Sequence, residues 1–498
     1  WQDDKEHTKG VACKDCPIGY VTKETKSHNY NSQGFCTDCD AYQPANLTTD
    51  KYDINGDDSK DAVYEISNAG QLYWFAGLVN GTLSGVTQNT SANTVLTMDI
   101  VVNENVLKPD GTVNEGTFKE WTPITGSSNS TYSGIFDGQN HTISGLYFNQ
   151  EDSYDVGLFG CNNGKIANAG ILDSYFYGTS KVGGVCGNNY TGTITNCYNT
   201  SSVSGLGTLG GVNGWNTGII TNCYNTGNVS GSSGFVGGVS GYNSKGTIIN
   251  SYNAGSVSGL ECVGGVSGIN YTGSITDCYN IGNVSGSEGY VGGVNGYNDG
   301  GTITNSYNAG SVSGIERYVG GVNGYNGEGT ITNCYNTGSS VSGSGYVGGV
   351  NGRNQGTITN CYNTSSVSGK ERYVGGVIGR NESNATITNC YYDSTIYTGN
   401  AIGANDGTTE KVEGKTTEQF KTGEIAYLLS QGCSTGEGDA TVTYDGSIWG
   451  QTIGTDTYPL LHGEKVYKSI TYMGCNDSSD VVSVSYSNEK KDVFGKHN

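Results

Sequence analysis

The stretch Tyr290–Gly314, YVGGVNGYNDGGTITNSYNAGSVSG, combines the glycine content of a disordered chain with a regular spacing of apolar residues. Seven of its 25 residues are glycine and none is proline. The residues between the glycines are mostly Val, Ile, Thr and Tyr, which favour strands. Gly and Asn divide the stretch into three short runs, YVGGVNG, GTITNSYN and SVSG, without a helical period. The stretch therefore predicts short strands joined by tight bends.

The same unit recurs eight times along the chain. A Gly-Gly pair returns in steps of 27 or 28 residues, with its first glycine at Gly183, Gly210, Gly237, Gly264, Gly292, Gly320, Gly348 and Gly375. A tyrosine column keeps nearly the same step, at Tyr198, Tyr224, Tyr252, Tyr279, Tyr307, Tyr335, Tyr362 and Tyr391. Short strands repeated at near-constant length are typical of a β-solenoid in which each unit forms one coil. Successive coils are then expected to stack about 4.8 Å apart.

The apolar spacing predicts where each coil bends. Val291 and Val294 are three residues apart, so strict strand alternation would send them to opposite faces. If both point inward, a bend must lie between them, and Gly292 and Gly293 can supply it. Asn305 can supply a second bend in the same way. Gly and Asn are the residues that tolerate positive φ.

These bends predict a thin core of stacked columns, which in this unit are Val291, Val294, Ile303, Ser306 and Val312. The fourth column holds six cysteines and two serines: Cys197, Cys223, Ser251, Cys278, Ser306, Cys334, Cys361 and Cys390. Serine in this column shows that pairing is not essential, and parallel neighbours suit disulfide geometry poorly, so free core thiols are expected. The asparagine columns 196/222/250 and 199/225/253 are expected to form amide ladders along the axis.

Composition and charge exclude several classes of protein. The chain has 82 Gly but only 5 Pro, with 10% aromatic residues, which argues against a flexible linker. Its net charge is −21, and its 25 Lys and Arg do not cluster, so neither nucleic acid nor an anionic membrane surface is expected as a partner. No apolar stretch is long enough to insert into a membrane. The low charge and the Asn, Ser and Thr content are typical of an extracellular protein.

Units such as VGGVNGYNDGGTITNSYNAGSVSG resemble the GLUG repeat of bacterial surface proteins. The order of the upstream segments YEISNAGQLYWFAGLVNG (64–81), WTPITG (121–126), YSGIFDGQNHTISGLYF (132–148) and VGLFG (156–160) is similar to the start of GLUG β-helices. Such β-helices occur in adhesins and in the non-catalytic part of IgA-cleaving zinc metallopeptidases. The resemblance covers about residues 60–395. It implies a right-handed parallel β-helix on a cell surface and does not imply an activity.

Four regions are expected from these observations. They are a zinc-ribbon-like module with four cysteines (1–45), an N-terminal cap with the first irregular coils (46–155), the GLUG-repeat β-helix (156–395) and a C-terminal cap (396–498). Short helices are predicted within 68–80 and at 416–432, the latter capped by Thr416 or Thr417. By resemblance, 449–461 is a closing segment. Such caps would protect the open strand edges of a β-helix. The chain itself is expected to be a mature protein or a segment of a longer one.

The N-terminal cysteines predict a metal site. Cys13, Cys16, Cys36 and Cys39 form two C-x2-C pairs separated by 19 residues, a spacing suited to tetrahedral zinc. A region so short and polar lacks a core of its own, so a metal would stabilise it. Two disulfides or a redox pair are the alternatives.

Three other features outside the C-x2-C pairs are candidates for a ligand role, a disulfide or a calcium site. His7 and His28 precede the two pairs and are expected to be surface or packing residues, with a ligand role as the alternative. Cys433 and Cys475 are expected to pair across the C-terminal cap. The segment DINGDD (53–58) faintly resembles a calcium loop, but Asp58 replaces its glycine and Tyr64 stands where the bidentate Glu belongs.

No motif in the chain carries recognisable catalysis. It has no H-E-x-x-H, G-x-S-x-G or P-loop sequence. Three acids share one turn column, with arginine beside two of them, and are expected to be solvated surface charges: Glu288, Glu316, Glu371, Arg317 and Arg372. A glycosidase or lyase would need a tighter cluster of acids.

The chain is therefore predicted not to be an enzyme. The expected function is a non-catalytic extracellular structural or adhesive repeat protein, such as a stalk, filament subunit or adhesin. Its expected partners are other copies of itself, in head-to-tail or lateral assembly, or a glycan or protein on a host or bacterial surface. A glycan-binding module that uses outward Tyr242, Tyr297 and Tyr325 as stacking platforms is one alternative. A carbohydrate-active β-helix enzyme is the other.

Overall fold

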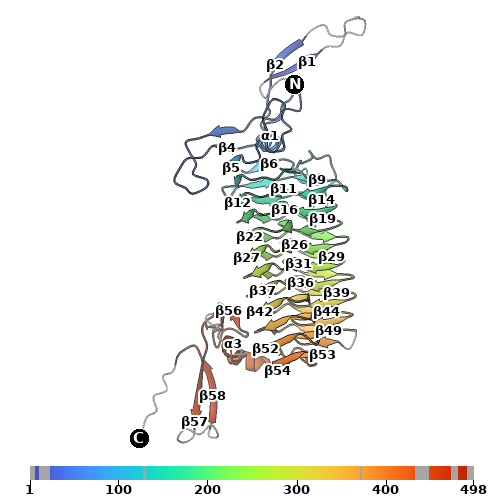
Figure 1. Cartoon of the computed structure of the whole chain (residues 1–498), viewed down its shortest axis with the longest axis vertical. Helices are drawn as coiled ribbons and strands as arrows, with labels where there is room; N and C mark the ends of the chain where they lie inside the picture. Colours follow the sequence, from blue (N-terminus) through green and yellow to red (C-terminus); the bar gives the residue numbers. More distant parts are fainter. Residues whose placement is uncertain are drawn as a thin grey trace. The chain divides into compact units, whose positions relative to one another are not determined.

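The computed structural model describes residues 6–10, 23–126, 130–370, 373–431, 448–472 and 481–490. It confirms an all-β parallel solenoid with few helices (Figure 1). The chain forms two compact units, Trp1–Ser258 (unit 1) and Gly259–Asn498 (unit 2), and each contains a stack of parallel coils. The region boundaries expected at 45, 155 and 395 stay predictions. In the described residues, no helix is long and apolar enough to span a bilayer.

The stretch Tyr290–Gly314 forms one coil of unit 2 from five short strands. They are β35 (Tyr290–Gly292), β36 (Asn295–Asp299), β37 (Thr302–Thr304), β38 (Tyr307–Asn308) and β39 (Val312–Gly314). The three predicted runs are present, and a bend divides each of the first two. Every strand pairs in parallel with its equivalent one repeat away, so that Val291 lies opposite Val319 and Ile303 opposite Ile331. Identical residues therefore stack on one another.

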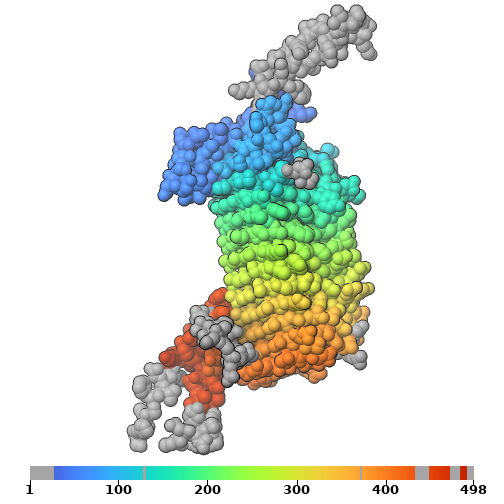
Figure 2. Space-filling model, viewed as in Figure 1, coloured from blue at the N-terminus to red at the C-terminus, as the bar shows by residue number. Residues whose placement is uncertain are grey.

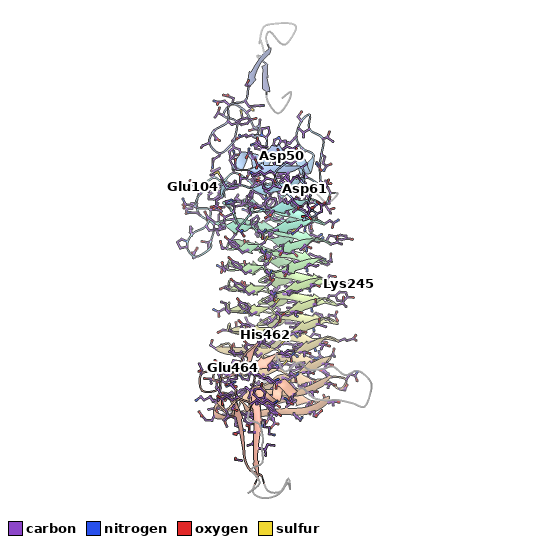
Figure 3. All side chains as sticks on the ribbon, turned by 90° about the vertical axis from the view of Figure 1, so that its left-hand side faces the viewer. Asp50, Asp61, Glu104, Lys245, His462 and Glu464 are labelled. Atoms are coloured by element: carbon purple, nitrogen blue, oxygen red, sulfur yellow. The ribbon has the colours of Figure 1, made fainter. Side chains whose placement is uncertain are left out.

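The predicted core columns are confirmed. Their five members in this coil are at most 1% exposed: Val291, Val294, Ile303, Ser306 and Val312. The equivalent residues of the other coils are buried too, including the cysteines of the fourth column. Outward positions carry charged side chains such as Lys245, on an exposed turn of unit 1 (Figure 3).

The two predicted kinds of bend have different causes. Asn305 has a φ of 50°, and the other asparagines of its column are also left-handed, as expected. Gly292 and Gly293 do not have positive φ, so the expected reason for these glycines was wrong. A Cβ on Gly292 would lie 2.0 Å from the carbonyl oxygen of Asn295, and one on Gly293 would lie 2.1 Å from that of Gly321. These glycines are needed for space, because backbones approach too closely for any side chain.

In unit 1 a helix packs against the first coils. Helix α1 (Ala69–Asn80) confirms the helix expected within 68–80. The Asn68 side chain accepts a hydrogen bond from the Gln71 N–H, and left-handed Gly81 ends the helix. Phe75 of α1 packs edge-on against Tyr132, with ring centroids 6.4 Å apart. The strands nearest to it along the chain are β3 (Asn46–Thr48) and β4 (Val63–Ile66) before it, and β5 (Asn93–Leu96), β6 (Ile100–Val101), β7 (Ile135–Asp137) and β8 (Thr142–Ser144) after it.

Unit 2 ends its coils with β52 (Thr386–Asp393), β53 (Ile402–Asn405) and β54 (Thr408–Lys415). Two short helices follow, α2 (Thr417–Lys421) and α3 (Glu424–Gln431), where one helix was predicted. Gly423, with a φ of 85°, breaks the expected helix between them. Thr416 caps α2 through a capping box, as one of the two predicted caps.

The segment after α3 covers a flank of the unit 2 coils. Trp449 lies on β55 (Trp449–Gly450), which pairs with β56 (Leu460–Leu461). Its ring packs with Phe420 onto the tyrosine column, in a buried cluster with Tyr335, Tyr362 and Tyr391. The indole N–H donates to Oδ1 of Asn333 at 3.3 Å. The space-filling view shows this segment, in red, against the side of the yellow and orange coils (Figure 2). The expected C-terminal cap is therefore, over this part, a lateral cover.

Two antiparallel hairpins complete the described chain. One joins β1 (Glu6–Gly10) to β2 (Lys23–Ser27) in unit 1. The other joins β57 (Tyr467–Tyr472) to β58 (Val481–Ser487) in unit 2.

Candidate functional site

The loop 28–43 of unit 1 folds tightly through backbone hydrogen bonds. Oδ1 of Asn31 accepts the N–H groups of Gln33 and Phe35, both at 3.0 Å. The N–H of Cys36 donates to the carbonyl of Ala41 at 3.0 Å, which closes the C-x2-C turn. These bonds fix the direction of the side chains that leave the loop.

The loop brings together one imidazole and two thiols. The ligand atoms of His28, Cys36 and Cys39 all lie within 4.8 Å of one another, and Nδ1 of His28 is 3.4 Å from Sγ of Cys39. Burial raises the pKa of Cys36, but the backbone N–H of Asp38 and the His28 side chain lower it further, to about 7. Burial raises the pKa of Cys39, against a hydrogen bond from the backbone N–H of Ala41. The site therefore favours one thiolate beside one thiol.

Two of the four predicted metal ligands, Cys36 and Cys39, are thus adjacent. Cys13 and Cys16 lie outside the described residues, as do Cys433 and Cys475, so the set of four cysteine ligands and that disulfide stay predictions. His28, which the sequence placed on the surface or in packing, points its imidazole at the thiols. In the sequence, the one indication that His28 could join the cysteines is its position eight residues before Cys36, and such a spacing is a weak indication of a ligand.

The loop docks on α1. The N–H of Gly70 donates to the carbonyl of Gln33 at 2.6 Å, and Nδ2 of Asn68 donates to Oε1 of Gln43 at 2.9 Å. A Cβ at position 70 would lie 2.0 Å from the carbonyl oxygen of Gly34. Contact this close requires glycine at position 70, so the loop and the helix form one structural element.

The core cysteines form no such cluster. Cys197, Cys223, Cys334, Cys361 and Cys390 are buried thiols that form no disulfide, as predicted, and Cys278 is buried beside Ser306. Burial raises the pKa of Cys223 and Cys361 well above its ordinary value. A protonated, buried thiol is neither a nucleophile nor a metal ligand.

The outward tyrosines do not present their ring faces. Tyr297 and Tyr325 stack with centroids 4.9 Å apart and an angle of 4° between their planes. The Arg353 guanidinium lies 5.3 Å from the Tyr325 centroid. In unit 1, Tyr242 stacks on Trp215 at 4.2 Å. In each stack, the neighbouring ring along the axis covers a face of the aromatic ring, so these columns offer mainly ring edges to solvent. A sugar that stacks on an aromatic ring needs a free ring face.

One acid and one base pair in unit 1, where Asp155 is buried and Lys181 is half-buried. Nζ of Lys181 is 3.5 Å from Oδ1 of Asp155 and lies 5.6 Å from the Trp215 ring centroid. The thiol of Cys161 is nearby, and burial together with the Asp155 charge raises its pKa to about 12. A thiol with this pKa stays protonated at neutral pH, so the group lacks a nucleophile.

The other acidic candidates are dispersed. Glu288 and Glu316 are exposed on turns, as expected for solvated charges, while Glu371 and Arg372 lie outside the described residues. In the DINGDD loop, Asp53 accepts the N–H groups of Gly56, Asp57 and Asp58. Its carboxylate therefore shapes an Asx-type turn, and Figure 3 shows the neighbouring Asp50 and Asp61 in the same part of unit 1. No described residues there form a group that could hold a metal.

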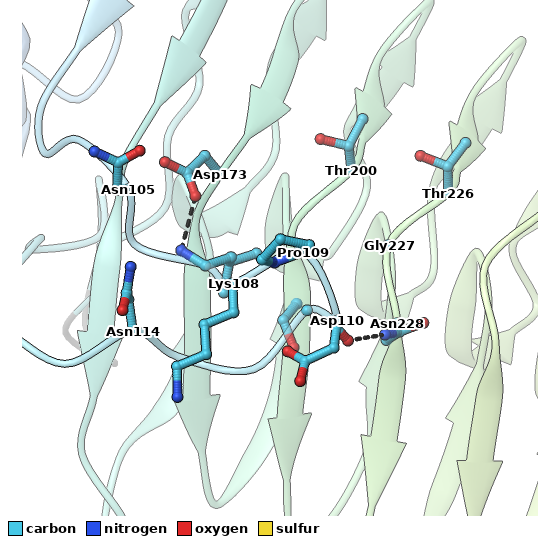
Figure 4. Close-up of a pocket in the computed structure, with 13 residues that line it drawn as sticks. Asn105, Lys108, Pro109, Asp110, Asn114, Asp173, Thr200, Thr226, Gly227 and Asn228 are labelled. Carbon is cyan, nitrogen blue, oxygen red and sulfur yellow. Dashed lines mark hydrogen bonds between the residues drawn. The ribbon is translucent and has the colours of Figure 1, made fainter.

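A polar cavity of about 640 Å³ lies on unit 1, under the segment 105–114. Both carboxylate oxygens of Asp173 anchor this segment by accepting the N–H groups of Val106 (3.1 Å) and Leu107 (2.8 Å). Nδ2 of Asn228 donates to the carbonyl of Asp110 at 3.4 Å. Figure 4 shows Lys108 and Asp110 on the segment, beside Asp173 and Asn228 of the coils. Sequence analysis missed this cavity because the segment interrupts the repeat without a motif of its own.

Amide ladders run through each unit. The ladder predicted at 199/225/253 is confirmed, with Nδ2 to Oδ1 distances of 2.9 and 2.8 Å. Asn222 donates to Asn196 in the corner column at 3.2 Å, as predicted. The sequence did not single out further ladders, such as Asn189 to Asn216 at 2.8 Å and Asn295 to Asn323 at 2.8 Å. Asn196 and Asn222 lie exposed at a corner, whereas the amides of the other ladders are buried and bond to their neighbours along the axis, so we read the ladders as structural.

Comparison with known proteins identifies one family motif and one similar crystal structure. The GLUG motif matches residues 178–204, 259–285 and 371–397, so the chain carries GLUG repeats, as the resemblance indicated. A crystal structure from Bacteroides ovatus, described as a "putative immunoglobulin A1 protease", is similar to this chain at 24% identity with a TM-score of 0.35. The similarity covers 82% of this chain and 94% of that one. No curated protein matches the chain.

Proposed function

We propose that this chain is a non-catalytic, extracellular repeat segment of a surface protein, with a structural or adhesive role. The observation that carries the proposal is the use of its polar side chains. Buried amides bond to one another from coil to coil, the core thiols are enclosed, and burial raises the pKa of Cys223 and Cys361 well above its ordinary value. The GLUG motifs support a place at the cell surface.

The structural role involves assembly with further copies of the chain, head to tail or side by side. Negative-stain microscopy of concentrated protein tests it. We expect ordered assemblies, and isolated particles at every concentration would refute this form of the proposal.

The absence of catalysis is tested separately. Incubation with linear polysaccharides and peptides should release no product. Product formation that is lost in Lys181→Met but kept in Lys245→Met would show that the Asp155–Lys181 pair is catalytic. Lys245 is a suitable control because it is an exposed lysine on a turn of the same unit.

The polar cavity of unit 1 favours glycan binding as a second candidate. Its volume of about 640 Å³ lies in the range of small-ligand sites, and its walls offer amide, ammonium and carboxylate groups. We expect any glycan-array signal to be lost when Asn114→Trp fills the cavity and to persist in Tyr297→Ala. A signal that persists in Asn114→Trp and is lost in Tyr297→Ala would show that the tyrosine columns bind the glycan instead.

A further inference from the structure

We propose that His28, Cys36 and Cys39 bind one zinc ion, with Nδ1 of His28 as a ligand, and that this ion holds the loop 28–43 against α1. The site differs from an all-cysteine site because it includes an imidazole. The loop that carries the ligands packs on helix α1 of unit 1, so the ion would join the loop to the rest of the fold.

The distance between ligand atoms fits tetrahedral zinc. With Zn–S about 2.3 Å, Zn–N about 2.0–2.1 Å and a tetrahedral angle, a sulfur and a nitrogen ligand lie about 3.5 Å apart. Sγ of Cys39 and Nδ1 of His28 are 3.4 Å apart. The Cys36 sulfur lies within 4.8 Å of the Cys39 sulfur and of a ring nitrogen of His28, and the two sulfurs are not bonded to each other. The three atoms therefore surround a point that a zinc ion can occupy.

Each sulfur also accepts a backbone hydrogen bond from the residue two positions later. The N–H of Asp38 donates to Cys36, and the N–H of Ala41 donates to Cys39. Metal-ligating groups need such partners to be held in a fixed direction. Softness of the ligands selects the metal, because two thiolates and an imidazole favour zinc over calcium or magnesium.

The loop has a small apolar core. Between residues 28 and 45, Cys36 and Ala45 are its buried apolar side chains. Phe35 and Tyr42 add half-buried rings that pack against Tyr73 of α1, with centroids 5.6 and 5.2 Å away. A structural zinc site would add folding free energy directly to so small a core. The hydrogen bonds from Gly70 to Gln33 and from Asn68 to Gln43 connect the loop to the start of α1, so a metal that orders the loop would also stabilise this end of the helix. Three ligands leave one position of the tetrahedron for water or for a group from elsewhere in the chain.

The test uses the full chain, purified without chelator. Metal analysis should find about one zinc per chain, and cobalt should replace it with visible d–d bands and a thiolate charge-transfer band. His28→Gln should lower zinc affinity about tenfold or more and change the cobalt spectrum. His141→Gln, a surface histidine beside Asp99, and Cys262→Ser, a buried cysteine outside the loop, are the matched controls and should change neither.

A measurement on the unmodified protein guards against variants that do not fold. Chelation should expose Cys36 and Cys39 to alkylation and speed hydrogen exchange of the Gly70 amide, while the core cysteines stay unreactive. Two results would overturn the proposal. One is a metal-free protein in which Cys36 and Cys39 are oxidised. The other is a zinc protein whose affinity and cobalt spectrum are the same in His28→Gln as in the wild type, which would mean that the histidine is not a ligand.

Discussion

Replacement of Asn308 by alanine tests whether the amide ladders stabilise the coils. This side chain is fully buried in unit 2. Its Nδ2 donates to Oδ1 of Asn336 at 2.8 Å and to the carbonyl of Gly310 at 2.7 Å. Its Oδ1 accepts from Nδ2 of Asn280 at 2.8 Å and from the N–H of Gly310 at 3.2 Å. All four hydrogen-bonding positions of the amide are therefore used.

The structure gives the size of the effect. Four buried hydrogen bonds at about 1 kcal/mol each predict a loss of about 4 kcal/mol in Asn308→Ala. Because a coil contacts its neighbours alone, this loss should fall on the coils around residue 308. A local loss of about 4 kcal/mol raises amide exchange about a thousandfold where exchange reports the opening equilibrium.

Hydrogen exchange followed by mass spectrometry measures this effect, with urea unfolding as a second readout. Asn283→Ala is the matched control, since Asn283 is an exposed asparagine of the same unit that accepts one bond, from the N–H of Ser311 at 3.3 Å. The control should change stability by about 0.5 kcal/mol or less. If Asn308→Ala exchanges and unfolds like the control, the ladders do not stabilise the coils and the reasoning fails.

Three other predictions follow from single positions. Cys361→Ser should cost about 1 kcal/mol or less in urea unfolding, because Ser306 already donates and accepts in the same way in its own coil. Cys361→Ala should cost about 2 kcal/mol by leaving the buried N–H of Cys334 without a partner, while the carbonyl of Thr359 keeps its bond from the N–H of Asn333 at 3.1 Å. Gly293→Ala should cost about 3 kcal/mol through the 2.1 Å approach to a carbonyl oxygen, while Gly454→Ala, with open space around it and a φ of 89°, should cost about 1 kcal/mol. In zinc-free protein, alkylation of Cys36 should be half-maximal near pH 7, because the pKa of this thiol is about 7. The lowered pKa stabilises the fold fully above the unfolded pKa of 9.0, and this contribution is lost as pH falls through 7. Half-maximal alkylation near pH 9 would contradict the prediction.

The repeating part of the fold could be predicted because the same pattern of apolar, Asn and Gly positions recurs in eight units. Columns of Val, Ile and Cys/Ser, with Asn at one corner, fixed the inward positions, the parallel stacking and one of the two bends. The reason for the Gly-Gly pair could not be predicted, because a need for space and a need for positive φ select the same residue. The difference depends on how close Gly293 comes to the carbonyl of Gly321, which involves a residue one coil away.

The candidate site was predicted less completely, since its parts do not repeat. The C-x2-C spacing identified Cys36 and Cys39, but the position of His28 depends on how the turns at Asn31 and Cys36 fold back. The lateral cover of unit 2 was missed for a similar reason. Trp449 meets Tyr335 and Tyr362 across about a hundred residues, and nothing in the local sequence of Trp449 indicates that contact.

This contrast indicates where activity should be sought in a chain of this kind. Within a coil, a polar side chain such as Asn308 uses its full hydrogen-bonding capacity on its own neighbours, so it has little left for a ligand. Ligand chemistry then requires a departure from the repeat. The described chain has such departures in the loop 28–43, in the segment 105–114 over the polar cavity, and in the cover that carries Trp449. The first brings one imidazole and two thiols together, the second forms a cavity and the third buries part of a tyrosine column. Substitutions in these three segments should therefore alter binding or assembly, while substitutions in the coils should alter stability.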